Sequence, residues 1–306
     1  MTKYLLKRLW QSMIAIFGIT VVVFVILHLT GDPVELMVSP TTPQEQMDIL
    51  REQLGYNDPL HIQYIRYIKG LLVGDFGTSY YYHEPALKVV LERVPATMEL
   101  ACTALLISVL LGIPAGIISA IKRNSFTDSV IRILALLGQC LPAFWLGIML
   151  IMLFSVKLGW LPTGGNEEGW KSLIMPAFTL GLFSAATICR LLRSNMIEVM
   201  SKEYIDVAKA KGLRSYVVIM KHAFKNAFSS ILTMLGMQFA SLLGGSVITE
   251  TVFAWPGVGR LVIQSIQSSD FAVVQCIVFL MAMVFVVTNL IVDLLYSVIN
   301  PRVRLQ

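Results

Sequence analysis

Six apolar stretches recur along the chain and are separated by polar segments. A helix needs about 20 apolar residues to cross a bilayer, and each stretch approaches or exceeds that length. The composition is 56% hydrophobic and 14% charged. An average soluble domain has roughly 25% charged residues. We therefore predict an all-α polytopic membrane protein with six transmembrane helices, and we exclude one or two soluble domains. The expected spans cover residues 9–29, 98–121, 130–156, 173–189, 228–248 and 271–299.

The first polar segments have distinct predicted roles. Residues 1–8 are basic, but the apolar stretch behind them lacks a small-residue cleavage site, so we expect an uncleaved first span rather than a signal peptide. Residues 30–96 are expected to form an external helical cap, because apolar residues recur at helical spacing between Gln44 and Gly74. Gly55 and Pro59 should break that helical stretch. The remaining segments are two external loops at 157–172 and 249–270, a cytoplasmic segment at 190–227 and a tail at 300–306.

The distribution of charge predicts the orientation in the membrane. The side that carries the N-terminus holds 16 of the 24 Lys and Arg residues and only four acids, whereas the opposite side holds 8 basic residues and 14 acids. Because basic residues favour the cytoplasmic side, both termini are expected in the cytoplasm. The net charge of +5 then follows from topology, and nothing else indicates binding to nucleic acid.

A polar stretch inside the cytoplasmic segment, EYIDVAKAKGLRSYVVIMKHAFKNA at 203–227, is predicted to form two short helices separated at Gly212. Ser201 stands where an N-cap belongs, and Glu203 places negative charge in the first turn. A glycine suits the left-handed position that follows a helix end. One interpretation is an amphipathic connector on the membrane surface. The other is a docking element for a soluble partner, with Ala208, Ala210 and Gly212 allowing close approach.

The sequence contains no motif that predicts catalysis or a resident metal. The four histidines, His28, His61, His83 and His222, form neither HExxH nor another reactive set, and GxSxG is absent. The four cysteines lie in or beside apolar stretches without ligand spacing, so we expect free thiols and no metal site. We therefore do not expect an enzyme.

Two kinds of transporter remain. A self-sufficient secondary transporter needs ionisable groups within its spans, and Asp293 is the only clear candidate, although a structural hydrogen bond is the more common role for such a residue. The other kind is driven by separate ATPases, because the chain has no GxxxxGK[ST] motif; the nearest stretch, GGNEEGWKS at 164–172, lies in a predicted external loop. A cytoplasmic docking element favours the second kind.

An ordered series of motifs resembles the permeases of ABC importers in the dipeptide, oligopeptide and nickel branch. The polar stretch is similar to the EAA loop of that family: Ala208 and Gly212 match fully, while Asp206 and Val207 stand where Glu and Ala are usual. The ending HAFKNA (222–227) is similar to that of this branch. The other matching stretches are YLLKRL, GDPV, LGYNDPLHIQY, GDFGTS, PATMEL, LPAFWLG, LGWLPTGG, RLLRSNMIEV, LLGGSVITETVFAWPGVGRL and NLIVDLLYSVINPRVR.

The resemblance implies a permease core over residues 95–299, located in the bacterial inner membrane, that imports small peptides by alternating access. Nickel or a metal chelate is the alternative cargo. The implied partners are a second, homologous permease, two cytoplasmic ATPases that use ATP and Mg²⁺, and an external substrate-binding protein, with no cofactor bound by this chain. The implied ATPase-coupling residues are Glu203, Asp206, Ala208, Lys209, Lys211, Gly212 and Arg214; candidate pathway residues are Gln139, Ser184, Gln238 and Ser241; candidate contacts for the binding protein are Trp255, Gly257 and Arg260.

Overall fold

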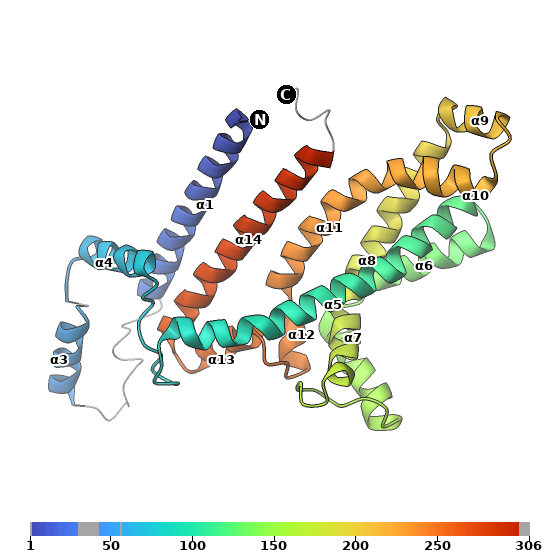
Figure 1. The fold of residues 1–306 in the computed structure, drawn as a ribbon. Coiled ribbons are helices and arrows are strands. Elements are labelled where there is room, and N and C mark those ends of the chain that lie inside the picture. The colour runs from blue at the N-terminus through green and yellow to red at the C-terminus, as the bar shows by residue number, and fades with distance from the viewer. Residues whose placement is uncertain (1, 30–42, 56, 300–306) are drawn as a thin grey trace. The chain divides into compact units, whose positions relative to one another are not determined.

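The computed structural model describes residues 2–29, 43–55 and 57–299 (Figure 1). These residues form helices joined by turns and loops and contain no strand, apart from one isolated bridge between Thr78 and Pro85. The all-α prediction is therefore confirmed. The GDPV motif and the C-terminal tail lie outside the described residues, and so does the side chain of Asp293.

The chain divides into two compact units. The first combines Met1–Thr97 with Pro256–Val286, and the second combines Met98–Trp255 with Val287–Gln306. Two long helices, α5 (Ala86–Ile121) and α14 (Phe271–Ile299), contribute residues to both units.

The first unit contains α1 (Thr2–Leu29), α3 (Gln44–Leu54), α4 (Leu60–Val73) and α13 (Val258–Gln267). Gly55 and Gly74 end α3 and α4 in the left-handed conformation, and each N–H returns to carbonyls of the last turn. Pro59 precedes α4 as its N-cap, so the predicted breaks at Gly55 and Pro59 are confirmed.

The first unit contains an apolar cluster and buried polar side chains that are hydrogen-bonded. The cluster includes Val90, Leu261 and Val273, which are at most 1% exposed. Asp270 is equally buried and accepts a hydrogen bond from the Ser79 hydroxyl, while Thr97 Oγ1 accepts one from the Val258 N–H at 2.8 Å. Each of these polar groups thus has the partner that burial demands.

In the second unit the helices other than α5 follow one another along the chain, and the longest connection between them, residues 158–169, joins η1 to α8 (Figure 1). They are α6 (Phe126–Cys140), α7 (Ala143–Leu150), the π-helix η1 (Ile151–Lys157), α8 (Trp170–Met200), α9 (Glu203–Ala210), α10 (Ser215–Val217), the π-helix η2 (Val218–Phe224), α11 (Lys225–Gly245) and α12 (Val247–Val252). Helix α8 packs against α6, α7 and α11, so it occupies the centre of this unit.

Small residues bring α5 and α8 into close contact. A Cβ atom added at Gly112 would lie 2.6 Å from the Ala185 carbonyl oxygen, and one at Gly181 would lie 2.6 Å from that of Ala104. Ser108 Oγ, between these contacts, donates to the Gly181 carbonyl at 2.9 Å. Close backbone approach through small residues and interhelical hydrogen bonds is typical of helices packed within a membrane.

Three helical stretches are long and apolar enough to cross a membrane: Ala86–Ile121, Trp170–Met200 and Phe271–Ile291. The pair Phe126–Cys140 and Ala143–Lys157 would provide a fourth span, but it bends by 103° where Leu141 and Pro142 interrupt the helix. Trp10–Val25 and Met234–Gly244 are shorter apolar helices. The multi-pass fold is thus supported, while the count of six spans stays a prediction.

Two expected boundaries differ from the observed helices. The apolar stretch at 173–189 belongs to a helix of 31 residues, because α8 continues without interruption through Arg190 and Arg193 to Met200. Arginine is a good helix former, so polarity alone does not end a helix. The expected external loop at 249–270 is also largely helical, since it contains the end of α12 and all of α13.

Candidate functional site

The docking stretch begins where α8 ends. The Ser201 hydroxyl donates to the Glu198 carbonyl at 2.8 Å and thereby completes the last turn of α8, while Lys202 occupies the N-cap of α9 without a side-chain hydrogen bond. The expectation that Ser201 caps the next helix was therefore wrong. The same hydroxyl can satisfy a helix C-terminus or an N-terminus, and here an orphan carbonyl lies closer.

Helix α9 has one buried face and one exposed face. Ile205 is 0% and Ala208 6% exposed, whereas the exposed fractions of Tyr204 and Val207 are 43% and 54%. Ala208 therefore packs inward against its own subunit instead of presenting a small residue to a partner. The other predicted coupling residues of this stretch, namely Glu203, Asp206, Lys209, Lys211, Gly212 and Arg214, are all exposed.

The turn after α9 has the conformation that the sequence predicted. Gly212 has a φ of 75°, in the left-handed region, and its N–H donates to the Lys209 carbonyl at 2.9 Å. A Cβ at this position would meet no atom within 4 Å, so the backbone angle alone favours glycine. The second predicted helix is present, but it is a short α10 followed by the π-helix η2.

An apolar cluster supports α9 from beneath. Ile205 and Ala208 belong to it together with Leu192 and Met196 of α8 and Ala223 of η2. Leu192, Met196 and Ala223 are fully buried. At the cluster's edge Asn226 Nδ2 donates to the Tyr204 hydroxyl at 3.1 Å and to the His222 carbonyl at 2.8 Å. A displacement of α9 would therefore be transmitted to α8 and α11 through packed side chains.

A buried ion pair joins the first turn of α6 to α8. Asp128 is 0% exposed, and both of its oxygens accept from Arg193, whose Nε and Nη2 each lie at 2.8 Å. The Ser119 hydroxyl donates to the same carboxylate at 2.5 Å and the Asn124 N–H at 2.9 Å. The Arg193 guanidinium holds the pKa of Asp128, which precedes the predicted span at 130–156, well below its usual range. This network ties α5, α6 and α8 together.

The sequence did not predict this ion pair, because its two partners lie 65 residues apart. Asp128 is one of just four acids on the predicted cytoplasmic side, among 16 basic residues. The only indication in the sequence was this scarcity of acids, since an acid on that side can pair with a basic residue on any neighbouring helix or loop.

Three of the four candidate pathway residues lie in two hydrogen-bonded sets. Gln139 Nε2 donates to Thr187 Oγ1 at 2.9 Å, and its Oε1 accepts from Arg190 Nη1. Ser184 Oγ donates to Gln238 Oε1 at 3.2 Å and so connects α8 with α11. Ser241 lies exposed on α11. Thr187 and Arg190 were not among the predicted pathway residues.

The FAWPGVGR stretch (residues 253–260) places its aromatic residues inside the protein. Phe253 and Trp255 are each 1% exposed, and the Trp255 N–H donates to the Glu250 carbonyl at 2.8 Å. The LGWLPTGG loop is fastened to it, because the Gly165 N–H donates to the Phe253 carbonyl at 2.8 Å. Gly257 is buried at the N-cap of α13 and Arg260 is half-buried. The Trp255 indole thus serves as an internal anchor of this loop.

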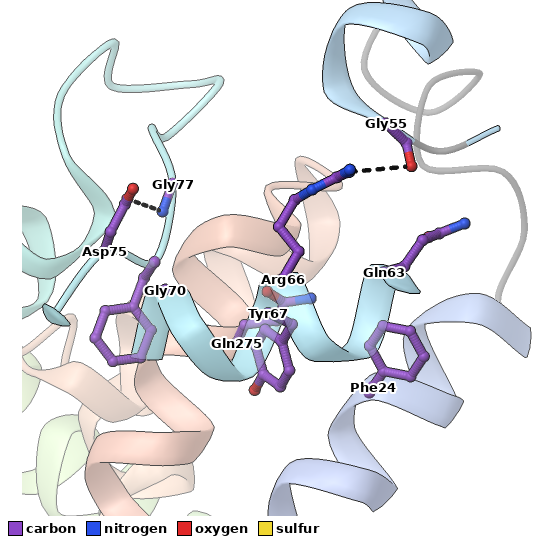
Figure 2. Close-up of a pocket in the computed structure, with 10 residues that line it drawn as sticks. Phe24, Gly55, Gln63, Arg66, Tyr67, Gly70, Asp75, Gly77 and Gln275 are labelled. Atoms are coloured by element: carbon purple, nitrogen blue, oxygen red, sulfur yellow. Dashed lines mark hydrogen bonds between the residues drawn. The ribbon is translucent and has the colours of Figure 1, made fainter. Parts of the chain in front are cut away.

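A cavity of about 260 Å³ with both polar and apolar lining residues lies in the first unit (Figure 2). Arg66 on its wall donates to the Gly55 carbonyl at 3.3 Å and pairs with Asp58 at 2.5 Å. Opposite it, Asp75 accepts from the Gly77 N–H at 2.9 Å. Across the whole described part of the chain, no three His, Cys, Asp or Glu side chains come together as a possible metal site.

Family models match both ends of the chain. Residues 112–305 match the binding-protein-dependent transport system inner membrane component, and residues 1–101 match the corresponding N-terminal model. The curated relatives include the glutathione transport system permease protein GsiC of Salmonella paratyphi A, 41% identical, and of Escherichia coli K12, 40% identical. Each alignment has 305 residues and covers 99% of both chains.

Solved structures resemble the fold. An inward-facing form of the MetNI methionine ABC transporter has a TM-score of 0.57 at 15% identity, over 69% of this chain and 96% of that chain. An amino acid ABC transporter with histidines has a TM-score of 0.53 at 19% identity, over 70% and 94%.

Proposed function

Because this chain belongs to the family of binding-protein-dependent transport system inner membrane components, we propose that it forms half of the pathway through which an ATP-driven importer takes up small peptides. The chain is a permease subunit of an ABC importer and a multi-pass protein of the inner membrane. The peptide cargo rests on one observation: relatives 41% identical over 99% of the chain carry the name of glutathione transport. Glutathione is a tripeptide, so we take it as the first cargo to test.

The predicted cytoplasmic placement of α9 suits it to couple this permease to an ATPase. Its exposed face carries Tyr204 and Val207 and is followed by Lys211 at the C-cap, while Ile205 and Ala208 attach it to its own subunit. Closure of the ATPases upon ATP binding would push or pull α9, and the apolar cluster beneath would carry that motion to α8 and α11. The nucleotide and Mg²⁺ act in the partner ATPases, and this chain contributes no catalytic group.

The remaining partners follow from the same assembly. A second, homologous permease completes the pathway, and an external binding protein delivers the cargo to the external cap and the FAWPGVGR loop. Both termini lie in the cytoplasm, in keeping with the excess of Lys and Arg on that side. Alternating access then releases the peptide inward after ATP hydrolysis.

Reconstitution of the complete importer tests this function. The chain is purified with its co-purifying subunits, placed in lipid vesicles and supplied with candidate binding proteins and labelled glutathione, dipeptide or nickel. We expect ATP-dependent uptake of glutathione or a dipeptide and stimulation of ATPase activity by the loaded binding protein. Uptake of nickel and of no peptide would show that nickel, not a peptide, is the cargo. Uptake driven by an ion gradient without ATP would refute the ABC mechanism.

Gly212→Trp tests the role of α9 separately. A Cβ at this position meets no atom of the chain itself, so the new side chain would obstruct chiefly a partner seated against this turn. We expect normal amounts of the subunit in the membrane but strongly reduced peptide-stimulated ATPase activity and uptake. Gly212→Ala, which shares the strained backbone angle without the bulk, is the matched control. Normal uptake by Gly212→Trp would contradict the docking proposal.

A further inference from the structure

A polar stripe follows the outward face of α8 in its second half. Thr187, Arg190, Ser194 and Glu198 recur at intervals of three or four residues, which places them on one side of a helix. Arg190, Ser194 and Glu198 are exposed and Thr187 is half-buried. The opposite side of α8 is apolar and fully enclosed, as the inward-facing Ile188, Leu192 and Met196 are each 0% exposed.

The neighbouring helices have the reverse character on their outward faces. On α5 the exposed fractions of Leu106 and Leu110 are 56% and 61%, and on α6 those of Ile133 and Leu134 are 58% and 61%. Apolar outward faces are suited to lipid. An ionisable side chain within a membrane helix instead faces the bundle interior or a water-filled cavity, because its burial in lipid is costly. The polar half of the outward face of α8, which begins where the predicted span at 173–189 ends, is therefore suited to water rather than to lipid.

Arg190 extends along this face toward an interruption in the neighbouring helix. Side chains in a helix lean toward its N-terminus, and Arg190 Nη1 accordingly reaches Gln139, two residues before the break at Leu141 and Pro142. Gln139 is fixed in turn by its 2.9 Å bond to Thr187. Interrupted helices within a membrane are where transporters place substrate sites.

The partners of Arg190 are neutral. Within residues 2–29, 43–55 and 57–299 the bond to Gln139 is the only hydrogen bond of the Arg190 side chain, and no carboxylate there forms an ion pair with it. A guanidinium offers five N–H donors in a planar fork that matches a carboxylate, so most of its donors remain available for a ligand.

We propose that Arg190, oriented by Gln139 and Thr187, is a binding site in the transport pathway for the carboxylate of the transported peptide. This site rests on the proposed import of peptides, and it adds the chemical group that the pathway recognises. A purely structural bond between α8 and α6 would account for the contact with Gln139, but it would require neither aqueous surroundings nor selectivity for anions.

Thiol labelling distinguishes these two roles without any measurement of transport. Phe183 is 53% exposed, lies one turn before Thr187 on the same face, and contributes only its backbone carbonyl to the network, as the acceptor of the Thr187 hydroxyl. Phe183→Cys is introduced into a chain whose four native cysteines are replaced, and the assembled complex is treated with an anionic or a cationic methanethiosulfonate. We expect both reagents to react, with the anionic one favoured roughly fivefold by the nearby guanidinium. Arg190→Gln should abolish that preference.

Protection by a ligand identifies the recognised group. S-methylglutathione, whose sulfur cannot react with the reagent, should slow the labelling of the Phe183→Cys chain at millimolar concentration, whereas its dimethyl ester should not. The chain that also carries Arg190→Gln should lose the protection. Failure of both charged reagents to react, an unchanged preference in Arg190→Gln, or equal protection by acid and ester would each overturn the proposal.

The outcomes separate this site from the proposed function. Carboxylate-dependent protection combined with no peptide uptake in the reconstituted importer would retain the anion site and reject the peptide cargo. Peptide uptake without carboxylate-dependent protection would retain the cargo and reject Arg190 as its binding site.

Discussion

Arg190 and Arg193 lie one turn apart on α8, yet their surroundings differ in kind. Arg193 is 20% exposed and makes a two-point contact with Asp128, a carboxylate without any exposed surface. Arg190 is exposed and contacts the neutral Gln139. The same residue type, on the same helix, thus forms a closed structural joint in one case and an open polar surface in the other. A step of three positions along the helix points the side chain toward a different neighbouring residue. That neighbour determines whether the arginine forms a closed ion pair or keeps donors available.

Loss of the carboxylate at the closed joint should have the largest effect. Asp128→Ala leaves Arg193 without its partner and removes the acceptor of the Ser119 and Asn124 donors, so we expect the unfolding free energy to fall by about 3 kcal/mol. The measurement is thermal unfolding of the purified complex in detergent. Arg132→Gln is the matched control, because Arg132 is 51% exposed and lies 3.6 Å from the same carboxylate. Equal destabilisation by the two variants would mean that the contact with Arg193 carries no special weight.

Replacing each arginine by glutamine in turn should show how differently the two positions contribute to stability. Arg193→Gln leaves the buried carboxylate with neutral hydrogen-bond donors and with the exposed Arg132, 3.6 Å away, as its nearest cation, so the unfolding temperature should fall clearly. Arg190→Gln should change the unfolding free energy by no more than about 0.5 kcal/mol. The double variant Asp128→Asn with Arg193→Gln should be less unstable than the sum of its parts, since no unpaired charge remains. The comparison fails if Arg190→Gln is the more destabilising of the two single variants.

The pH dependence of the unfolding temperature should differ between variants of Arg193 and variants of Arg190. The folded-state pKa of Asp128 is depressed. Its contribution is therefore fully present above its ordinary pKa of about 4 and is lost as the pH falls from there toward the folded value. Unfolding temperatures measured from neutral pH down to about one pH unit below that ordinary pKa should therefore decline less steeply at the acidic end in Arg193→Gln than in the parent. Arg190→Gln should retain the slope of the parent, and a flattened profile in that variant would contradict the assignment.

Patterns that depend on neighbours in the chain were predictable from sequence. The apolar stretches indicated a membrane protein, helical spacing indicated the cap helices, and glycine indicated the ends at Gly55 and Gly212. Single-residue choices at helix ends were less predictable, because Ser201 can serve either the helix before it or the helix after it. The length of α8 was underestimated for a related reason: arginine marks the edge of an apolar stretch without ending the helix.

The amino-acid sequence by itself determined the membrane class, the helical architecture, the polar docking stretch and the motifs of the permease family, because each depends on spacing and composition within short windows. Only the tertiary structure decided that Ala208 faces inward, that Asp128 closes on Arg193 65 residues away, and that Arg190 meets Gln139 beside a broken helix. Helical periodicity states which side chains share a face. It does not state which other helix that face meets, and the partner of a charged group is set by that meeting.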